Sequence, residues 1–289
     1  MRVADAADRG DALTSGVLPL AAAAGLAWQA VAGGVWRAEA PMAGKGPLAS
    51  VRVVALRLDP RQVRFELASA LRDQSTRGAW TVDSLPAGAL AGFNAGQFTG
   101  PMPWGWLVRD GHEEQPPGRG GLAMAFAVDD SGRVGLLEPE ELAAHRERAA
   151  LGFQSYPAIL VARGALPGAL QAPGRGVDLE HRDSRLALGV LEDGGVLVAL
   201  TRFTGLGPAG EQLPWGPTAG EMAAWMRARG CRRAVLLDGG MSGQLAARAA
   251  DGSMTRWRNW RPVPLGLLVM PRGSPISSAI TSPARPAGR

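Results

Sequence analysis

The chain has 289 residues, with 40 glycines, 22 prolines and one cysteine, and its formal net charge of +5 comes almost wholly from arginine. This length is sufficient to bury a substantial core, and the many glycines and prolines favour short strands and turns over a helical bundle. The single cysteine, Cys231, excludes an intramolecular disulfide and a cysteine-rich zinc site, and we expect its side chain to be a small buried apolar group.

The two ends of the chain differ in composition from its middle. Residues 16–36 are apolar, but Pro19 and Gln29 interrupt them, which is poor for a signal peptide and short for a membrane-spanning helix. Residues 1–27 are therefore predicted to be an N-terminal segment, with a remnant of an export signal as one interpretation. Residues 273–289, dominated by Ser, Pro, Ala, Gly and Arg, predict a disordered tail. Residues 28–272 are predicted to form one domain.

Apolar runs separated by turn-forming residues predict three pairs of neighbouring strands. These pairs are 51–58 with 63–70 around the turn at 59–61, 122–128 with 134–137 around 129–132, and 185–190 with 196–203 around 192–195. Helices are expected chiefly at 139–150 and 219–229. We therefore predict an α+β fold of mixed, mostly antiparallel sheets with a few flanking helices, in a single domain.

One carboxylate follows directly after a fully apolar run. The apolar residues 234–237 are followed by Asp238-Gly239-Gly240. This pattern predicts a buried strand that leads into a glycine-rich loop. Upstream, Thr218 and Glu221 have the spacing of a capping box at the start of a helix. An ordinary tight turn is the alternative for Asp-Gly-Gly, but its place after a buried strand favours a functional carboxylate.

Two other short segments combine apolar and polar residues in a similar way. The run 90–93 ends in Asn94, followed by Ala95, Gly96 and Gln97, and the predicted strand 185–190 begins with Arg185. Asn94 could equally be a turn residue with left-handed geometry, and Arg185 the exposed end of a strand.

Four segments in this order resemble motifs of the phosphodiester glycosidase family. They are Asn-Ala-Gly-Gln-Phe at 94–98, Arg-Leu-Ala-Leu-Gly at 185–189, Gly-Pro-Thr-Ala-Gly-Glu at 216–221 and Leu-Asp-Gly-Gly-Met-Ser-Gly at 237–243. The chain departs from the family pattern at four positions. Gln97 replaces an aromatic residue, Leu186 a hydroxyl residue, Met241 a third glycine and Gly243 a second serine. The resemblance covers roughly residues 28–271.

This resemblance implies a secreted or periplasmic hydrolase that cleaves a sugar-phosphate linkage in a bacterial-type glycan, such as an exopolysaccharide, or in a glycoconjugate. Its substrate would be a carbohydrate or sugar phosphate. The phosphate that leaves has a second pKa of about 6, so one strong carboxylate can suffice where ordinary glycosidases use two. The alternative is a non-catalytic module that binds cell-wall or phosphopolysaccharide chains.

The same resemblance implies roles for particular residues. Asp238 is expected to be the base or nucleophile, Arg185 to hold the phosphate, and Asn94 to bind a sugar hydroxyl or acetamido group. The amides of Gly239 and Gly240, together with Ser242, are expected to bind phosphate oxygens. The full set of expected substrate-binding residues is Gly96, Gln97, Thr218, Gly239, Gly240 and Ser242.

No cofactor and no metal are expected. The three histidines are far apart, the sole lysine, Lys45, lies outside any Walker loop, and no Gly-x-Ser-x-Gly motif occurs. An oxygen-ligated divalent cation stays open, for which Asp238 with Asp183 or Glu221 would be the ligands.

The basic composition is interpreted as an arginine-rich surface, so no nucleic-acid partner is expected. No membrane span is expected either, because the apolar run at 16–36 is short and interrupted. The Arg-Trp alternation at 256–261 fits an exposed strand or loop that packs its indoles on the body of the domain, in preference to stacking on bases. Its alternative place is the edge of the pocket, since Trp and Arg both suit sugars and phosphates.

Overall fold

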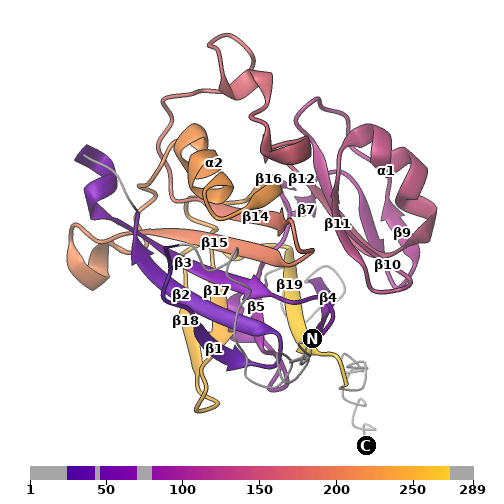
Figure 1. The fold of residues 1–289 in the computed structure, drawn as a ribbon, viewed down its shortest axis with the longest axis horizontal. Coiled ribbons are helices and arrows are strands. Elements are labelled where there is room, and N and C mark those ends of the chain that lie inside the picture. Colours follow the sequence, from indigo (N-terminus) through magenta and orange to yellow (C-terminus); the bar gives the residue numbers. More distant parts are fainter. Residues whose placement is uncertain (1–24, 43–45, 70–79, 274–289) are drawn as a thin grey trace, which may run out of the picture.

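The computed structural model describes residues 25–42, 46–69 and 80–273. The predictions for residues 1–24 and for the tail from residue 274 lie outside these residues. Antiparallel strands dominate the described part of the chain, and α2 lies on one side of the largest sheet while β5, β17 and β19 lie on the other (Figure 1).

The largest sheet has seven strands in the order β1-β2-β3-β15-β14-β16-β13. Its strands are β1 (Gln29–Ala32), β2 (Val35–Pro41), β3 (Val51–Leu58), β13 (Ala158–Leu160), β14 (Leu186–Leu191), β15 (Val196–Phe203) and β16 (Cys231–Leu237). A five-stranded sheet of order β18-β17-β5-β19-β4 contains β4 (Val63–Ser69), β5 (Ala91–Asn94), β17 (Leu245–Arg248), β18 (Met254–Trp257) and β19 (Leu265–Pro271).

A second five-stranded sheet has the order β11-β10-β12-β8-β9. It contains β8 (Leu107–Arg109), β9 (His112–Gln115), β10 (Met124–Asp129), β11 (Val134–Leu137) and β12 (Ala149–Ser155), and the short β6 (Phe98–Thr99) and β7 (Met102–Pro103) pair separately. The α-helices of the described residues are α1 (Pro139–His145) and α2 (Ala219–Arg227). Short 3-10 helices occupy Gly46–Ser50, Val82–Ser84, Arg146–Arg148, Ala162–Gly164, Gly168–Leu170 and Gly207–Gly210.

The seven-stranded sheet packs against a core on each face, which explains why its central strand β14 is apolar throughout. Successive side chains of a strand point to opposite faces. In β14, Leu186 and Leu188 join a core shared with both five-stranded sheets, whereas Ala187 joins a second core beneath α2. Cys231 lies in this second core, where burial raises the pKa of its thiol well above the usual range.

The predicted mostly antiparallel sheet with few helices is confirmed. The two α-helices have only seven and nine residues, so the fold is more strongly β than an α+β class suggests. The hairpins β10–β11 and β14–β15 form as predicted. The predicted helix 139–150 ends at residue 145, because β12 begins at residue 149 and pairs with β10.

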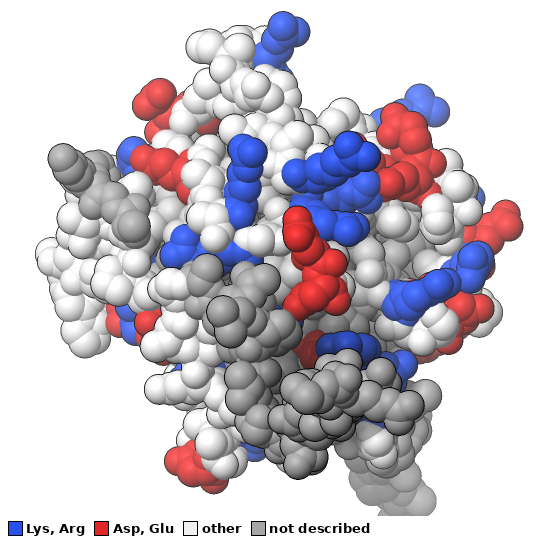
Figure 2. All heavy atoms as spheres, in the orientation of Figure 1, with Lys and Arg blue, Asp and Glu red and all other residues white. Residues whose placement is uncertain are grey.

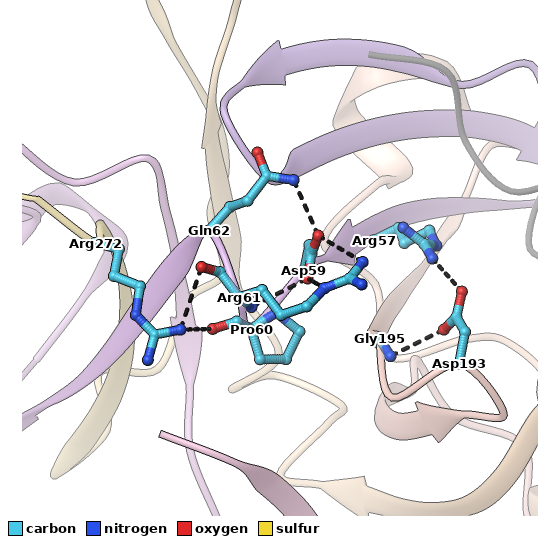
Figure 3. A network of polar contacts seen from close by, with 8 residues as sticks. All are labelled: Arg57, Asp59, Pro60, Arg61, Gln62, Asp193, Gly195 and Arg272. Carbon is cyan, nitrogen blue, oxygen red and sulfur yellow. Dashed lines mark hydrogen bonds and ion pairs between the residues drawn. The ribbon is translucent and has the colours of Figure 1, made fainter. Parts of the chain in front are cut away.

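The predicted pairing of 51–58 with 63–70 is wrong, because β3 pairs with β2 and β15 whereas β4 pairs with β19 in another sheet. The turn between them therefore carries the chain from one sheet to the next. Asp59 organises this turn, and its carboxylate accepts hydrogen bonds from the backbone amide and side chain of Arg61 and from Gln62 (Figure 3). Arg272 donates to the carbonyls of Pro60 and Arg61.

Charged side chains of both signs lie close together over the face shown in Figure 2, and much of that face is uncharged. Ion pairs in the described part of the chain include Arg52 with Glu211 and Arg258 with Asp83. None of the helices in the described part of the chain has the length and apolar character that crossing a bilayer requires.

Replacing Asp59 with alanine should destabilise the protein in a pH-dependent way. Burial alone would raise the pKa of Asp59, but the hydrogen bonds from Arg61 and Gln62 outweigh it and lower the pKa. A lowered pKa gives stability that is present above the unfolded pKa and is lost as the pH falls through the folded pKa. At neutral pH we expect a loss of about 1–3 kcal/mol.

Urea titrations from neutral to acidic pH measure this effect. The matched control is Asp251→Ala, which removes an exposed turn carboxylate that accepts from Ser253 and should cost less. A difference between wild type and Asp59→Ala that does not shrink on acidification would contradict the assignment.

Candidate functional site

A cavity of about 280 Å³ lies where β16 ends and β14 begins. It is lined by residues from five separate parts of the chain: Gln97, Pro157, Asp183, Arg185, Leu236, Leu237, Asp238, Gly239, Gly240, Met241, Ser242 and Arg261. The expected residues Asp238, Arg185, Gln97, Gly239, Gly240 and Ser242 are among them.

The pairing of β14 with β16 brings Arg185 and Asp238 to the same edge of the sheet. These strands are antiparallel, and Leu186 lies opposite Leu237. Arg185 directly precedes β14 and Asp238 directly follows β16, so both side chains leave the buried sheet at one point. A shift of either strand by one residue would move its side chains from one core to the other, for instance Leu186 and Leu188 into the core beneath α2.

Gly239 and Gly240 are required by the close approach of another loop. A Cβ at Gly239 would lie 2.4 Å from the carbonyl oxygen of Ser184, and one at Gly240 would lie 2.9 Å from the Asp183 carboxylate. Gly240 also has a φ of +52°. Its amide donates to the Ser184 carbonyl at 2.7 Å, so this amide is occupied within the protein rather than free to bind phosphate as expected.

Asn94 fixes the backbone of Asp238 and does not line the cavity. It is fully buried, and its Nδ2 donates to the Asp238 carbonyl at 2.7 Å while its Oδ1 accepts from the Gln244 amide at 3.0 Å. The Asp238 amide donates to the carbonyl of Gly96 at 2.9 Å. Both ends of the Asn94 amide are thus occupied, which gives this residue a positioning role in place of the expected contact with a sugar.

Thr218 and Gln97 also make contacts within the protein. Thr218 lies outside the cavity lining, and with Glu221 it forms the predicted capping box of α2. Gln97 does line the cavity, and its side chain donates to the Tyr156 carbonyl at 3.0 Å.

Two carboxyl groups share the cavity. Burial raises the pKa of Asp238, and the neighbouring Asp183 raises it further, whereas a hydrogen bond from Ser242 and the charge of Arg261 oppose the rise. Burial likewise raises the pKa of Asp183, opposed by Arg185 and His181. Within the described part of the chain, Asp183 Oδ1 is buried and accepts no hydrogen bond. Both carboxyls therefore titrate at higher pH than exposed aspartates.

Hydrogen bonds to backbone carbonyls fix the position of the Arg185 guanidinium. Its Nε donates to the Pro217 carbonyl at 3.1 Å and one terminal nitrogen donates to the His181 carbonyl at 2.7 Å. Burial lowers the pKa of this guanidinium, and the charge of Asp183 opposes that change. A guanidinium that already lies in the cavity has little side-chain entropy left to lose on binding an anion.

Sequence reasoning gave Asp183 and Arg261 little weight, although both line the cavity. Asp183 lies two residues before Arg185, and this proximity is the signal that could have identified it. Arg261 closes the Arg-Trp alternation, for which the edge of the pocket was only the alternative interpretation. Its amide donates to the Met241 carbonyl at 3.0 Å. Among the described residues, no three His, Cys, Asp or Glu side chains are grouped so that they could hold a metal ion.

A model of the phosphodiester glycosidase family matches residues 87–270. The chain belongs to the phosphodiester glycosidase family. This match contains every residue that lines the cavity. The family predicted from the four sequence motifs is therefore confirmed. A comparison with curated proteins finds no match.

The fold is similar to several solved structures. The catalytic domain of zebrafish N-acetylglucosamine-1-phosphodiester alpha-N-acetylglucosaminidase, auto-inhibited by its pro-peptide, is 15% identical, with 84% of each chain covered and a TM-score of 0.57. A hypothetical protein from Synechocystis is 15% identical over 83% of this chain and 62% of its own, with a TM-score of 0.51. A protein from Burkholderia pseudomallei is 18% identical over 76% and 74%, with a TM-score of 0.50. At these identities the likeness shows the shared fold.

Replacing Gly239 with alanine should distort the loop that carries Asp238. The added Cβ would collide with the Ser184 backbone, which cannot move without disturbing Arg185, so we expect a loss of about 1–3 kcal/mol of stability. Thermal unfolding measures it. The control is Gly33→Ala, where the nearest atom to a Cβ is the Gln62 side chain at 3.9 Å. Equal stability of the two variants would contradict the proposed contact.

Proposed function

We propose that the protein hydrolyses the bond between a sugar and phosphate in a glycosyl phosphodiester of a bacterial-type glycan. The observation that carries this proposal is that Asp238, Arg185 and Arg261 share one cavity in a chain of the phosphodiester glycosidase family. A carboxylate with two guanidinium groups suits a substrate with an electrophilic carbon next to a phosphate. The zebrafish relative is named for cleavage of an N-acetylglucosamine phosphodiester. A secreted or periplasmic location stays a prediction.

In the proposed reaction Asp238 either removes a proton from a water that attacks the anomeric carbon or attacks this carbon itself. In the second case a glycosyl ester forms, and water then hydrolyses it to release the sugar and a proton and to restore the carboxylate. The bond between this carbon and the phosphate oxygen breaks, and the electron pair leaves with the phosphate monoester. Arg185 and Arg261 stabilise the negative charge that grows on the phosphate oxygens. Because such a phosphate leaves without protonation, no second carboxyl is required as a general acid.

The electrostatics of the cavity agree with this assignment of roles. Asp238 has to be ionised to act as a base or nucleophile. Burial raises its pKa, and Ser242 and Arg261 oppose that rise by favouring the charged form. Asp183 lacks a hydrogen bond to Oδ1 within the described residues, and its charge makes the ionised form of Asp238 less favourable. Asp183 therefore tunes the pKa of Asp238 and need not itself exchange a proton with the substrate.

Asp238→Asn should abolish hydrolysis and retain binding. The amide keeps the shape of the side chain and loses only the charge, so a small-alcohol diester of N-acetylglucosamine 1-phosphate should bind within a few-fold of wild type while turnover falls by about a thousandfold or more. Calorimetry measures binding and product release measures turnover. Binding without turnover by the wild type would favour the alternative, a non-catalytic module for phosphopolysaccharide.

Asp183→Asn tests whether one carboxylate suffices. Removing the charge of Asp183 lowers the pKa of Asp238, because a like charge no longer disfavours ionisation. The acid limb of the kcat/KM profile, which reports ionisation of the free enzyme, should therefore move to lower pH. The maximal rate should remain within about tenfold of wild type. A loss as large as that of Asp238→Asn would instead favour a conventional acid and base pair.

A further inference from the structure

A larger groove of about 860 Å³ lies beside the catalytic cavity. Tyr156 lines the groove and the next residue, Pro157, lines the cavity, so consecutive residues form part of the wall of each space. The side chain of Gln97, which lines the cavity, donates a hydrogen bond to the Tyr156 carbonyl and so links the two segments. Anything that extends from a substrate in the cavity across this wall enters the groove.

The groove presents a fixed aromatic surface. The rings of Trp104 and Tyr156 meet edge to face, with centroids 4.6 Å apart, and Tyr156 is 41% exposed. The Trp104 amide donates to the Gln97 carbonyl at 2.7 Å, and its indole packs so closely on Gly118 that a Cβ there would lie 2.9 Å from the ring. Such a surface, apolar on its faces and polar at its edges, suits a sugar ring, which has C–H faces and hydroxyl edges.

The charge of the groove is positive. Its lining contains Arg119 and Arg175 and no acidic residue. Both arginines are exposed, and neither forms a side-chain hydrogen bond or an ion pair with the described part of the chain. Other arginines, such as Arg182 with Glu221, are paired. Unpaired guanidinium groups beside an aromatic surface complement a phosphate-bearing ligand.

The volumes of the groove and the cavity indicate how long a ligand each can hold. The groove falls within the range of about 300–1,000 Å³ typical of sites for extended small-molecule ligands, and the cavity lies just below it. A short sugar phosphodiester can therefore be held by the cavity alone. Only a longer chain, with further sugars and further phosphates, would also fill the groove.

We propose that this groove binds the part of a phosphate-bearing polysaccharide adjacent to the bond being cleaved. A sugar ring lies against Trp104 and Tyr156, and a neighbouring phosphate binds Arg119 and Arg175. This inference rests on the proposed function in that it extends the substrate of the same site. It makes the protein an enzyme of anionic polymers rather than of short sugar phosphates.

The test compares a polymer with a short substrate. The variant Arg119→Gln/Arg175→Gln removes two exposed charges, and its matched control, Arg227→Gln/Arg232→Gln, removes two exposed arginines outside the groove. The ligands are a polymer of N-acetylglucosamine 1-phosphate and the small-alcohol diester of the same sugar phosphate. Binding is measured by calorimetry in the Asp238→Asn background, and hydrolysis is measured with Asp238 present.

The groove variant should bind the polymer about tenfold more weakly, or weaker still, and its affinity for the small diester should be unchanged. The control variant should bind both ligands with unchanged affinity. Trp104→Ala should also lower the affinity for the polymer and leave the affinity for the small diester unchanged. Unchanged polymer affinity in the groove variant, or no binding of the polymer by the parent protein, would overturn the proposal.

Binding and hydrolysis separate this proposal from the proposed function. If the groove variant selectively loses polymer binding and the parent protein hydrolyses neither substrate, the proposed groove is supported and the proposed enzymatic function is refuted. If the parent protein hydrolyses the small diester and the groove variant and the control bind the polymer with equal affinity, the enzymatic function is supported and the proposed groove is refuted.

Discussion

The antiparallel pairing of β14 with β16 is the constraint on which the site depends. Each strand contributes alternate side chains to two different cores, so a one-residue slip would exchange the side chains of these cores. The observed register places Arg185 and Asp238 at one edge of the sheet. Asn94 then fixes the backbone of Asp238 by a hydrogen bond from another sheet. A carboxylate is thus held at the rim of the core with little freedom to reorient before a substrate arrives, as preorganised catalysis requires.

Burial of charge gives the cavity its chemical character. Two carboxyls and a guanidinium that leave water lose hydration, which raises the pKa of Asp183 and Asp238 and lowers that of Arg185. Each of these groups faces an opposite charge or a hydrogen-bond donor, which favours its charged form and opposes the effect of burial. A substrate phosphate would add a further negative charge to this balance, and Arg185 and Arg261 are placed to compensate it.

Local patterns predicted much of the fold and part of the site. The hairpins β10–β11 and β14–β15, the capping box of Thr218 and the strand before Asp238 follow from turn residues and periodicity over short stretches. The pairing of 51–58 with 63–70 failed because both strands have longer-range partners that no local pattern reveals. The positioning role of Asn94 was missed for the same reason, since its partners are the distant backbones of Asp238 and Gln244.

The central claim is that the bond between carbon and oxygen breaks, with phosphate as the leaving group. Hydrolysis of a small sugar phosphodiester in oxygen-18-labelled water, followed by mass spectrometry of the phosphate monoester, tests it most directly. Attack at the anomeric carbon with Asp238 as base or nucleophile predicts a phosphate product without the label, because its oxygens all come from the substrate. Label in the phosphate would show attack at phosphorus and would contradict the account.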